Sequence, residues 1–197
     1  MHTVQSRAGD SGFTLVEVLV AVFVLAVGML GVANLQVTSK RTNFESVQRS
    51  NATFFAQELL ERIRANTTEL SVYTDGGLGR TIVPGTDSGL DDTDCVSAAC
   101  DATDVAMYDL YEFSEALRGI AEAAGANVTG GLVSPTVCVT GPEESPGYVT
   151  VAIAWRGMTK LSSPITTDCG AGSGLYDDSD GNADVHRRVL LVETFID

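Results

Sequence analysis

Residues Phe13–Ala33 form a run of 21 residues that is almost entirely apolar and contains one charged side chain, Glu17. An α-helix of this length, rising about 1.5 Å per residue, spans about 30 Å, the thickness of the hydrocarbon core of a bilayer. A secretory signal has a shorter apolar core with a small-residue cleavage site after it, whereas here the small residue, Gly12, precedes the run. The run therefore predicts a membrane-spanning helix.

Glu17 is the anomaly in this run. An unpaired carboxylate inside a membrane helix costs at least about 2.5 kcal/mol, so Glu17 needs a partner or a purpose. If the chain is cleaved between Gly12 and Phe13, the new amine of Phe13 in a neighbouring subunit becomes a natural counter-charge for Glu17. Such a pair would fix the axial register of a helical assembly. The alternative is a tolerated glutamate near the interface, four residues into the run.

The string Gly12–Glu17 (GFTLVE) and the apolar run after it resemble the class III signal of type IV prepilins and type II secretion pseudopilins. The resemblance implies that a prepilin peptidase cuts between Gly12 and Phe13 and N-methylates Phe13, and that Glu17 acts in assembly. It also implies a single pass through the inner membrane with the head in the periplasm, followed by display in a pilus at the cell surface.

The leader departs from the family pattern in its charge. Leaders of this family are typically basic, but here Arg7 and His2 are offset by Asp10. Lys40 and Arg41 also follow the run closely, so the positive-inside rule does not fix the orientation. The expected orientation therefore depends on the resemblance and on the cysteines.

Beyond the run, apolar residues recur at three- and four-residue steps, which predicts an amphipathic helix that continues to about Asn66. The residues of this stripe are Phe44, Val47, Asn51, Phe54, Phe55, Leu59 and Ile63. No proline occurs before Pro84, so one intact helix is expected. The predicted organisation is a leader, a membrane and assembly helix, its amphipathic continuation and a globular head, at residues 1–12, 13–33, 34–66 and 67–197.

The remaining chain predicts an α+β head. Residues 74–104 are rich in Gly, Asp, Ser and Thr and indicate an irregular loop. Val105–Ala124 has the helical period, and Thr136–Thr140, Tyr148–Arg156 and Arg188–Ile196 are rich in strand-forming residues. The expected apolar face of the helix consists of Met107, Leu110, Phe113, Leu117, Ile120 and Ala121. A long leading helix packed on an antiparallel C-terminal sheet, with a second helix and irregular loops, is the pilin-like arrangement.

All four cysteines, Cys95, Cys100, Cys138 and Cys169, lie beyond the apolar run. An even count beyond a membrane anchor indicates disulfides formed in an oxidising compartment. Of the three pairings, Cys95–Cys100 with Cys138–Cys169 is favoured. A zinc site is the rival, but the chain has no CxxC pair and His186 is the only histidine outside the leader.

The strong negative charge limits the partners of the head. The net charge is −14. Residues 1–33 hold Arg7, Asp10 and Glu17, a net −1, so the rest of the chain carries −13. A surface of this charge repels phosphate backbones, which argues against nucleic-acid binding through the bulk surface and is typical of an exported, soluble head.

The sequence indicates no catalysis. It contains no GxSxG, P-loop or HExxH pattern, and the Gly170–Gly174 stretch has no lysine after it to bind a phosphate. His186 is expected at the surface, at the start of a strand. We therefore predict no catalytic residue, no cofactor and no enzymatic activity.

One acidic cluster could supply oxygen ligands to Ca²⁺. Asp178, Asp180, Asn182 and Asp184, with Asp177 beside them, fall within eight residues that turn on a glycine. The glycine is one position off for an EF-hand loop, and no glutamate stands at the closing position. A solvated acidic loop is the favoured interpretation, and these residues are only weak metal candidates.

Several scattered motifs resemble the minor pilin PilV family. They are the Glu61–Asn66 string, the Cys95–Cys100 spacing before Asp109, and the Val149–Gly157 strand. The resemblance implies a low-abundance subunit that helps initiate, prime or cap a type IV pilus. Its partners would be other minor pilins, the major pilin, the prepilin peptidase and the inner-membrane assembly machinery.

Two other functions remain open from the sequence. One is a minor pseudopilin of a type II secretion system, which is similar over the first forty residues. The other is a membrane-anchored binding protein that uses the acidic head to bind a cation or a basic target.

Overall fold

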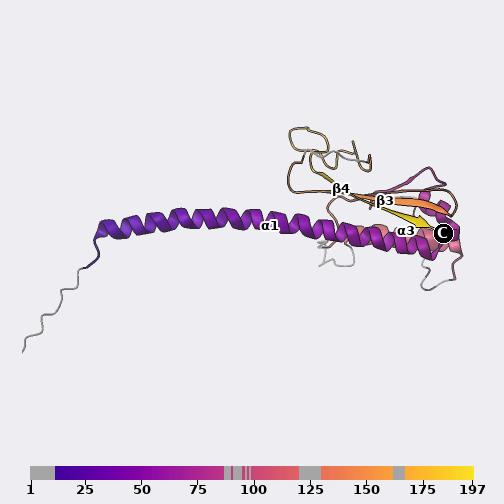
Figure 1. The fold of residues 1–197 in the computed structure, drawn as a ribbon, viewed down its shortest axis with the longest axis horizontal. Helices are drawn as coiled ribbons and strands as arrows, with labels where there is room; N and C mark the ends of the chain where they lie inside the picture. The colour runs from indigo at the N-terminus through magenta and orange to yellow at the C-terminus, as the bar shows by residue number, and fades with distance from the viewer. Residues whose placement is uncertain are drawn as a thin grey trace, which may run out of the picture. The chain divides into compact units, whose positions relative to one another are not determined.

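The structure is a computed structural model, and it describes residues 12–86, 90, 95, 97, 99–119, 130–161 and 167–197. The chain divides into two units, Met1–Asn43 and Phe44–Asp197. Helix α1, Leu15–Ala65, contributes to both units (Figure 1). Its end is one residue short of the predicted Asn66, so the expectation of one uninterrupted helix is confirmed.

In the first unit, α1 has no buried side chain among its large apolar residues. From Phe13 to Val37, each of these side chains is between 50% and 84% exposed. Within the described residues, α1 is the one helix long and apolar enough to cross a membrane, with a mean hydropathy of 2.7 over its best window. The predicted length and composition of a membrane span are thus present in a formed helix.

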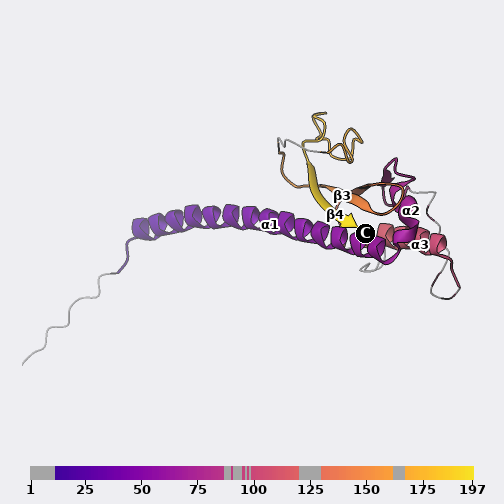
Figure 2. The same ribbon diagram turned by 45° about the vertical axis from the view of Figure 1, so that its right-hand side comes forward.

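The second unit is an α+β fold, as predicted. Its helical part comprises the end of α1, a short 3-10 helix η1 (Thr67–Glu69), α2 (Leu70–Thr74) and α3 (Ala102–Arg118). In Figure 2, α2 and α3 lie beside the C-terminal end of α1.

The sheet of the second unit has four antiparallel strands in the order β1-β2-β3-β4. They are β1 (Arg80–Ile82), β2 (Thr136–Thr140), β3 (Gly147–Arg156) and β4 (Arg187–Ile196). The bounds of β2 agree with the prediction, and β3 and β4 each begin one residue earlier. Alternating β-branched and aromatic residues made these three strands recognisable.

Strand β1 was missed, because residues 74–104 were predicted to be an irregular loop. It has three residues, too few for an alternating pattern, and its last residue, Ile82, pairs with Val137 of β2. Pairing with a distant strand therefore specifies β1, since its own composition is ordinary for a loop.

The second helix ends earlier than predicted. Its start is capped by Asp101, whose side chain accepts a hydrogen bond of 2.9 Å from the backbone N–H of Asp104. Its last residue is Arg118, because Gly119 has a φ of +71°, a left-handed conformation that terminates a helix. The predicted continuation over residues 120–124 lies outside the described residues.

One core joins the helices and the sheet. On α1 the buried residues are Gln48, Ala52, Phe55, Ala56, Leu59, Leu60 and Ile63. The apolar ones among them pack with residues of α2, α3 and all four strands in a single cluster. The predicted stripe is correct from Phe55 onward, but Val47 and Phe54 are 55% and 62% exposed while Gln48 is buried. The first part of the stripe was wrong, because the core at that level lies on the neighbouring side of α1.

Candidate assembly site and head surfaces

The N-terminal end of α1 carries the three residues predicted to act in processing and assembly. Gly12 and Phe13 precede the helix, and the Phe13 side chain is 84% exposed. Thr14 occupies the cap position, and its Oγ1 accepts a hydrogen bond of 3.3 Å from the backbone N–H of Glu17. A threonine hydroxyl in this place satisfies one of the free N–H groups at a helix start.

Glu17 lies in the first turn of α1 and is exposed. A carboxylate in the first turn interacts favourably with the partial positive charge of the helix N-terminus. No ion pair within the described residues involves Glu17, so its carboxylate is free to accept a cation from another molecule. The structure thus places Gly12, Phe13 and Glu17 together, while their roles in cleavage, methylation and assembly stay predictions.

Both favoured disulfides are formed. The S–S distances are 2.02 Å for Cys95–Cys100 and 2.08 Å for Cys138–Cys169. Cys138 lies in β2 opposite Ala152 of β3, between residues that face the core. Its side chain is therefore on the outer face of the sheet, the face opposite α1, and the disulfide ties the segment after residue 166 to that face.

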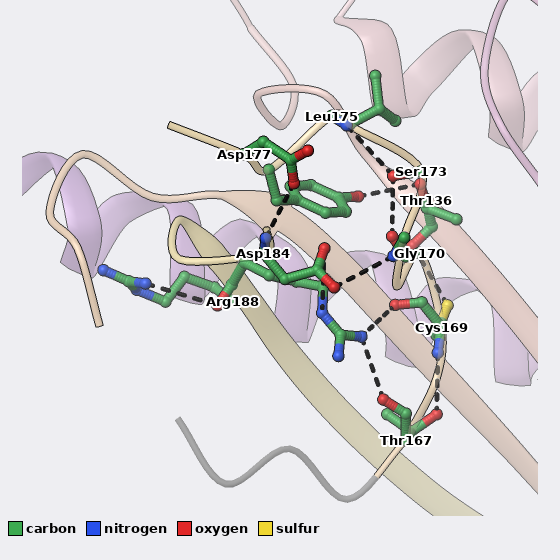
Figure 3. Close-up of polar contacts among 12 residues, drawn as sticks. Thr136, Thr167, Cys169, Gly170, Ser173, Leu175, Asp177, Asp184 and Arg188 are labelled. Carbon is green, nitrogen blue, oxygen red and sulfur yellow. Dashed lines mark hydrogen bonds and ion pairs between the residues drawn. The ribbon is translucent and has the colours of Figure 1, made fainter. Parts of the chain in front are cut away.

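Residues 167–186, which we call the disulfide loop, are held on the outer face by hydrogen bonds as well (Figure 3). The guanidinium of Arg187 donates to the backbone oxygens of Thr167 and Cys169, at 3.1 Å and 2.7 Å. The hydroxyl of Tyr176 donates to Oγ1 of Thr136 in β2 at 2.9 Å. These contacts make the loop a structural part of the head.

The weak Ca²⁺ candidates are engaged with donors of the protein. The Asp178 carboxylate accepts hydrogen bonds from the backbone and side-chain nitrogens of Asn182, both at 2.8 Å, and pairs with Nζ of Lys160 at 2.6 Å. The side-chain hydrogen bond from Asn182, with the ion pair to Lys160, holds the pKa of Asp178 well below its usual value. Asp184 accepts from the backbone N–H of Gly172 at 3.1 Å. The loop thus satisfies the carboxylate of Asp178 and one oxygen of Asp184, whereas Oδ1 of Asp184 is buried without a hydrogen-bond partner among the described residues.

In the part of the chain that the structure describes, no group of three His, Cys, Asp or Glu side chains could hold a metal ion. The assignment of residues 177–184 as a solvated acidic loop, with metal ligands as the weaker alternative, stays a prediction.

His186 is partly buried, whereas the sequence placed it at the surface. Its backbone N–H donates to the carbonyl of Tyr176 at 3.0 Å, and its own carbonyl accepts from Gly157 at 2.8 Å. Its Nδ1 is buried and has no hydrogen-bond partner within the described residues. The backbone hydrogen bonds of His186 therefore hold the segment just before β4, and its role is structural.

A polar cluster that the sequence did not reveal links α1, α2 and α3. Arg62 of α1 pairs with Asp109 of α3 at 2.8 Å and with Glu58 at 3.0 Å. Tyr73 of α2 donates its hydroxyl to the other oxygen of Asp109 at 2.8 Å. Burial, reinforced by the neighbouring Asp109, raises the pKa of Tyr73 above its ordinary value. The cluster holds the three helices in register.

Gln48 is a second residue whose function was missed. It is 5% exposed, and its amide nitrogen donates to the carbonyl of Gly131 at 3.2 Å. Its amide oxygen accepts from the backbone N–H of Val133 at 3.0 Å. One side chain therefore joins α1 to the segment that precedes β2. A glutamine in a mostly polar stretch, Glu45–Asn51, gives no sign of this in the sequence.

An exposed apolar N-terminal helix, preceded by Gly12-Phe13 and continued into an α+β head, is a pilin-like architecture. Comparison with family descriptions agrees. Residues 34–111 match the family described as Tt1218-like, type IV pilin Tt1218, and residues 7–33 match the prokaryotic N-terminal methylation motif. The two matches support a type IV pilin-type, membrane-anchored subunit. Comparisons with curated proteins and with solved structures gave no match.

Proposed function

We propose that this chain is a minor subunit of a type IV pilus, of the kind found in the PilV family, and that it helps initiate, prime or cap pilus assembly. It would be made as a prepilin, cut between Gly12 and Phe13, and N-methylated on Phe13. The observation that carries the proposal is an uncovered apolar helix with a carboxylate in its first turn, whose first part lies within the matched methylation motif, residues 7–33.

The apolar helix can be buried both in the membrane and in the pilus fibre. Its side chains are covered by lipid tails before assembly and by the helices of other subunits afterwards, so apolar burial changes little on transfer. Glu17 does change its situation. In the bilayer its carboxylate lacks a partner within the described residues, which is unfavourable, and in the fibre an amine from a neighbouring subunit would pair with it.

The spacing of the two charges would set the register between subunits. After cleavage the amine belongs to Phe13, four residues before Glu17, which corresponds to about one helical turn of 5.4 Å. If the amine of one subunit meets the Glu17 of the next, the subunits are displaced along the fibre by a defined step. A head with two disulfides fits export to an oxidising compartment such as the periplasm.

The proposal implies a structural role without catalysis. The expected partners are the prepilin peptidase, the inner-membrane assembly machinery, other minor pilins and the major pilin. The proposal does not involve binding of nucleic acid by the bulk surface of the acidic head.

The test compares three variants at one position in cells that make pili. Glu17→Ala and Glu17→Gln remove the charge, and Glu17→Asp keeps the charge on a shorter side chain. We expect all three variants to insert in the membrane. We expect the amount of the two uncharged variants in sheared pili to be at least about tenfold lower, since the amine of the neighbouring subunit would be buried without a counter-charge, which costs several kcal/mol. Immunoblots of membrane and sheared fractions measure both quantities.

Two outcomes would contradict the proposal. One is normal incorporation of Glu17→Gln into pili. The other is a mature protein, examined by mass spectrometry, that retains residues 1–12 and still supports piliation. Normal piliation together with lost type II secretion in a deletion strain would assign the chain to a pseudopilus instead.

A further inference from the structure

Strand β4 is the last strand of the sheet and has a neighbour, β3, on one side (Figure 2). The backbone N–H of Gly157 donates to the carbonyl of His186 at 2.8 Å, which extends the β3–β4 ladder by one pair. Hydrogen-bonded pairs alternate along an antiparallel ladder. Counting from His186, the even-numbered residues of β4 therefore bond to β3, and the odd-numbered residues direct their N–H and C=O groups to the free edge.

The free edge consists of Val189, Leu191, Glu193 and Phe195. Just before it, the carbonyl of Val185 points the same way and accepts a hydrogen bond of 2.8 Å from Leu161. For the four edge residues themselves, no hydrogen bond between described residues involves their outward N–H or C=O groups. A long edge with unpaired backbone groups is a template for another strand, and proteins usually protect such edges.

The side chains of the same four residues lie on the outer face of the sheet. Leu191 and Phe195 are 43% and 48% exposed, and Phe195 packs edge-to-face against Tyr148 of β3, with ring centroids 5.1 Å apart. Glu193 lies between them and opposite Thr150, without an ion pair in the described part of the chain. The edge thus shows an acidic side chain flanked by apolar ones.

This pattern disfavours a second copy of the chain as the occupant. In the antiparallel registers that pair three or more of the four edge residues with each other, Glu193 meets another Glu193, Leu191 or Val189. Like charges directly opposite are destabilising, and no such register provides a cation. Two heads would also repel through their net charges, since the whole chain carries −14.

We propose that the free edge of β4 binds an extended segment of a different protein, in which a lysine or arginine is flanked two residues away on each side by apolar residues. The backbone of that segment pairs with the outward groups of the edge. Its cation lies opposite Glu193, and its apolar side chains cover Leu191 and Phe195. This mode of binding adds a fifth strand to the sheet. It concerns the head alone and does not depend on the pilus assignment.

The test uses the full-length chain in detergent micelles and a fluorescent, capped heptapeptide in which threonine alternates with leucine, lysine and leucine. Two N-methylated forms provide the matched controls. Methylation of the leucine and lysine nitrogens blocks the side of the peptide that faces β4, whereas methylation of the threonine nitrogens blocks the far side. Fluorescence anisotropy measures the dissociation constant of each peptide.

We expect the lysine peptide and its threonine-methylated form to bind similarly, and the leucine- and lysine-methylated form to bind at least about tenfold more weakly, since it loses backbone hydrogen bonds. Replacing the peptide lysine by glutamate is expected to weaken binding by about two- to fivefold. The variant Glu193→Lys is expected to reverse this preference.

The proposal is overturned if the lysine peptide does not bind at about 1 mM, or if both methylated forms bind equally well. The charge assignment is overturned if Glu193→Lys leaves the preference unchanged. A concentration-dependent dimer in sedimentation that Glu193→Lys strengthens or abolishes would show that a second copy, and not a foreign segment, occupies the edge.

Discussion

The two parts of helix α1 share one secondary structure and differ in what surrounds them. In the first part, up to Asn43, the large apolar side chains from Leu15 to Val37 are all at least half exposed. After Phe44, one face is buried in the core of the head, and Ala52, Leu59 and Ile63 have no exposed area. Up to Ala33 the first part is apolar on all sides apart from Glu17, whereas the second part has a polar side, so only the second can be completed by its own chain. The first part needs lipid or other subunits.

The sharpest test of this comparison is the same substitution in the two parts of the helix. Leu59→Ala removes a fully buried side chain, and we expect it to lower the free energy of unfolding of the head by about 2–5 kcal/mol. Leu25→Ala removes a side chain that is 58% exposed, and we expect no change in that free energy. Urea unfolding in micelles, followed by the fluorescence of Trp155, the single tryptophan, reports on the head.

Both substitutions keep the helix propensity of the host position high, so a difference between them reports on packing. Equal destabilisation by the two variants would show that the first part of α1 is also covered by the chain itself, which would break the comparison.

Covalent ties distinguish the regions in a second way, since all four cysteines belong to the head. Replacing Cys138 and Cys169 by alanine opens a loop with a sequence separation of 31 residues, and we expect a loss of about 3.5–4 kcal/mol. The matched control is the alanine pair at Cys95 and Cys100, where the separation is 5 residues and the expected loss is about 2 kcal/mol.

The same urea measurements give both values, and circular dichroism in micelles reports on the helix. An equal loss for the two pairs would show that loop length does not govern their stabilisation. A large loss of helix on removal of Cys138–Cys169 would show that the first part of α1 depends on the head for its formation.

Local patterns were sufficient to predict α1, α3 and three of the four strands, whereas β1, η1 and α2 were missed. The apolar run, the helical period up to Ala65 and the alternating strands are repeated signals, so β2, β3 and β4 were placed to within one residue. The end of the second helix was predicted too late, because the apolar period continues beyond Gly119, although a glycine is a common helix stop signal.

Contacts between distant segments were not predictable from the sequence. Arg62 and Asp109 are 47 residues apart, and Gln48 is 83 residues from Gly131, so no local spacing brings either pair together. The free edge of β4 was hidden for the same reason, since the strand is readable but its position in the sheet is a property of the whole fold. For the assembly site, the residues and their order were predicted, and the cap by Thr14 was not.

The smallest expected effect comes from a comparison of two carboxylates. Asp178 has partners within the chain, and Glu17 has none among the described residues. The Asp178 side chain is 2% exposed, and its contacts with Asn182 and Lys160 lower its pKa from the ordinary 3.8. A lowered pKa contributes stability that is fully present above the unfolded value and is lost as the pH falls through the folded value. Asp178→Asn should therefore be less stable than the parent at pH 7, and the difference should shrink at pH values below about 4.

Asp180→Asn is the control within the loop, because the Asp180 side chain is 71% exposed and makes one of the two contacts with Lys160. Glu17→Gln is the control in the first part of α1, where no partner lies within the described residues. We expect both controls to follow the parent between pH 7 and pH 3 in thermal unfolding monitored by Trp155. If Glu17→Gln changed the acid response of the head as much as Asp178→Asn, the carboxylate of Glu17 would already have a partner in its own chain. Glu17 would then not need the amine of a neighbouring subunit as a counter-charge.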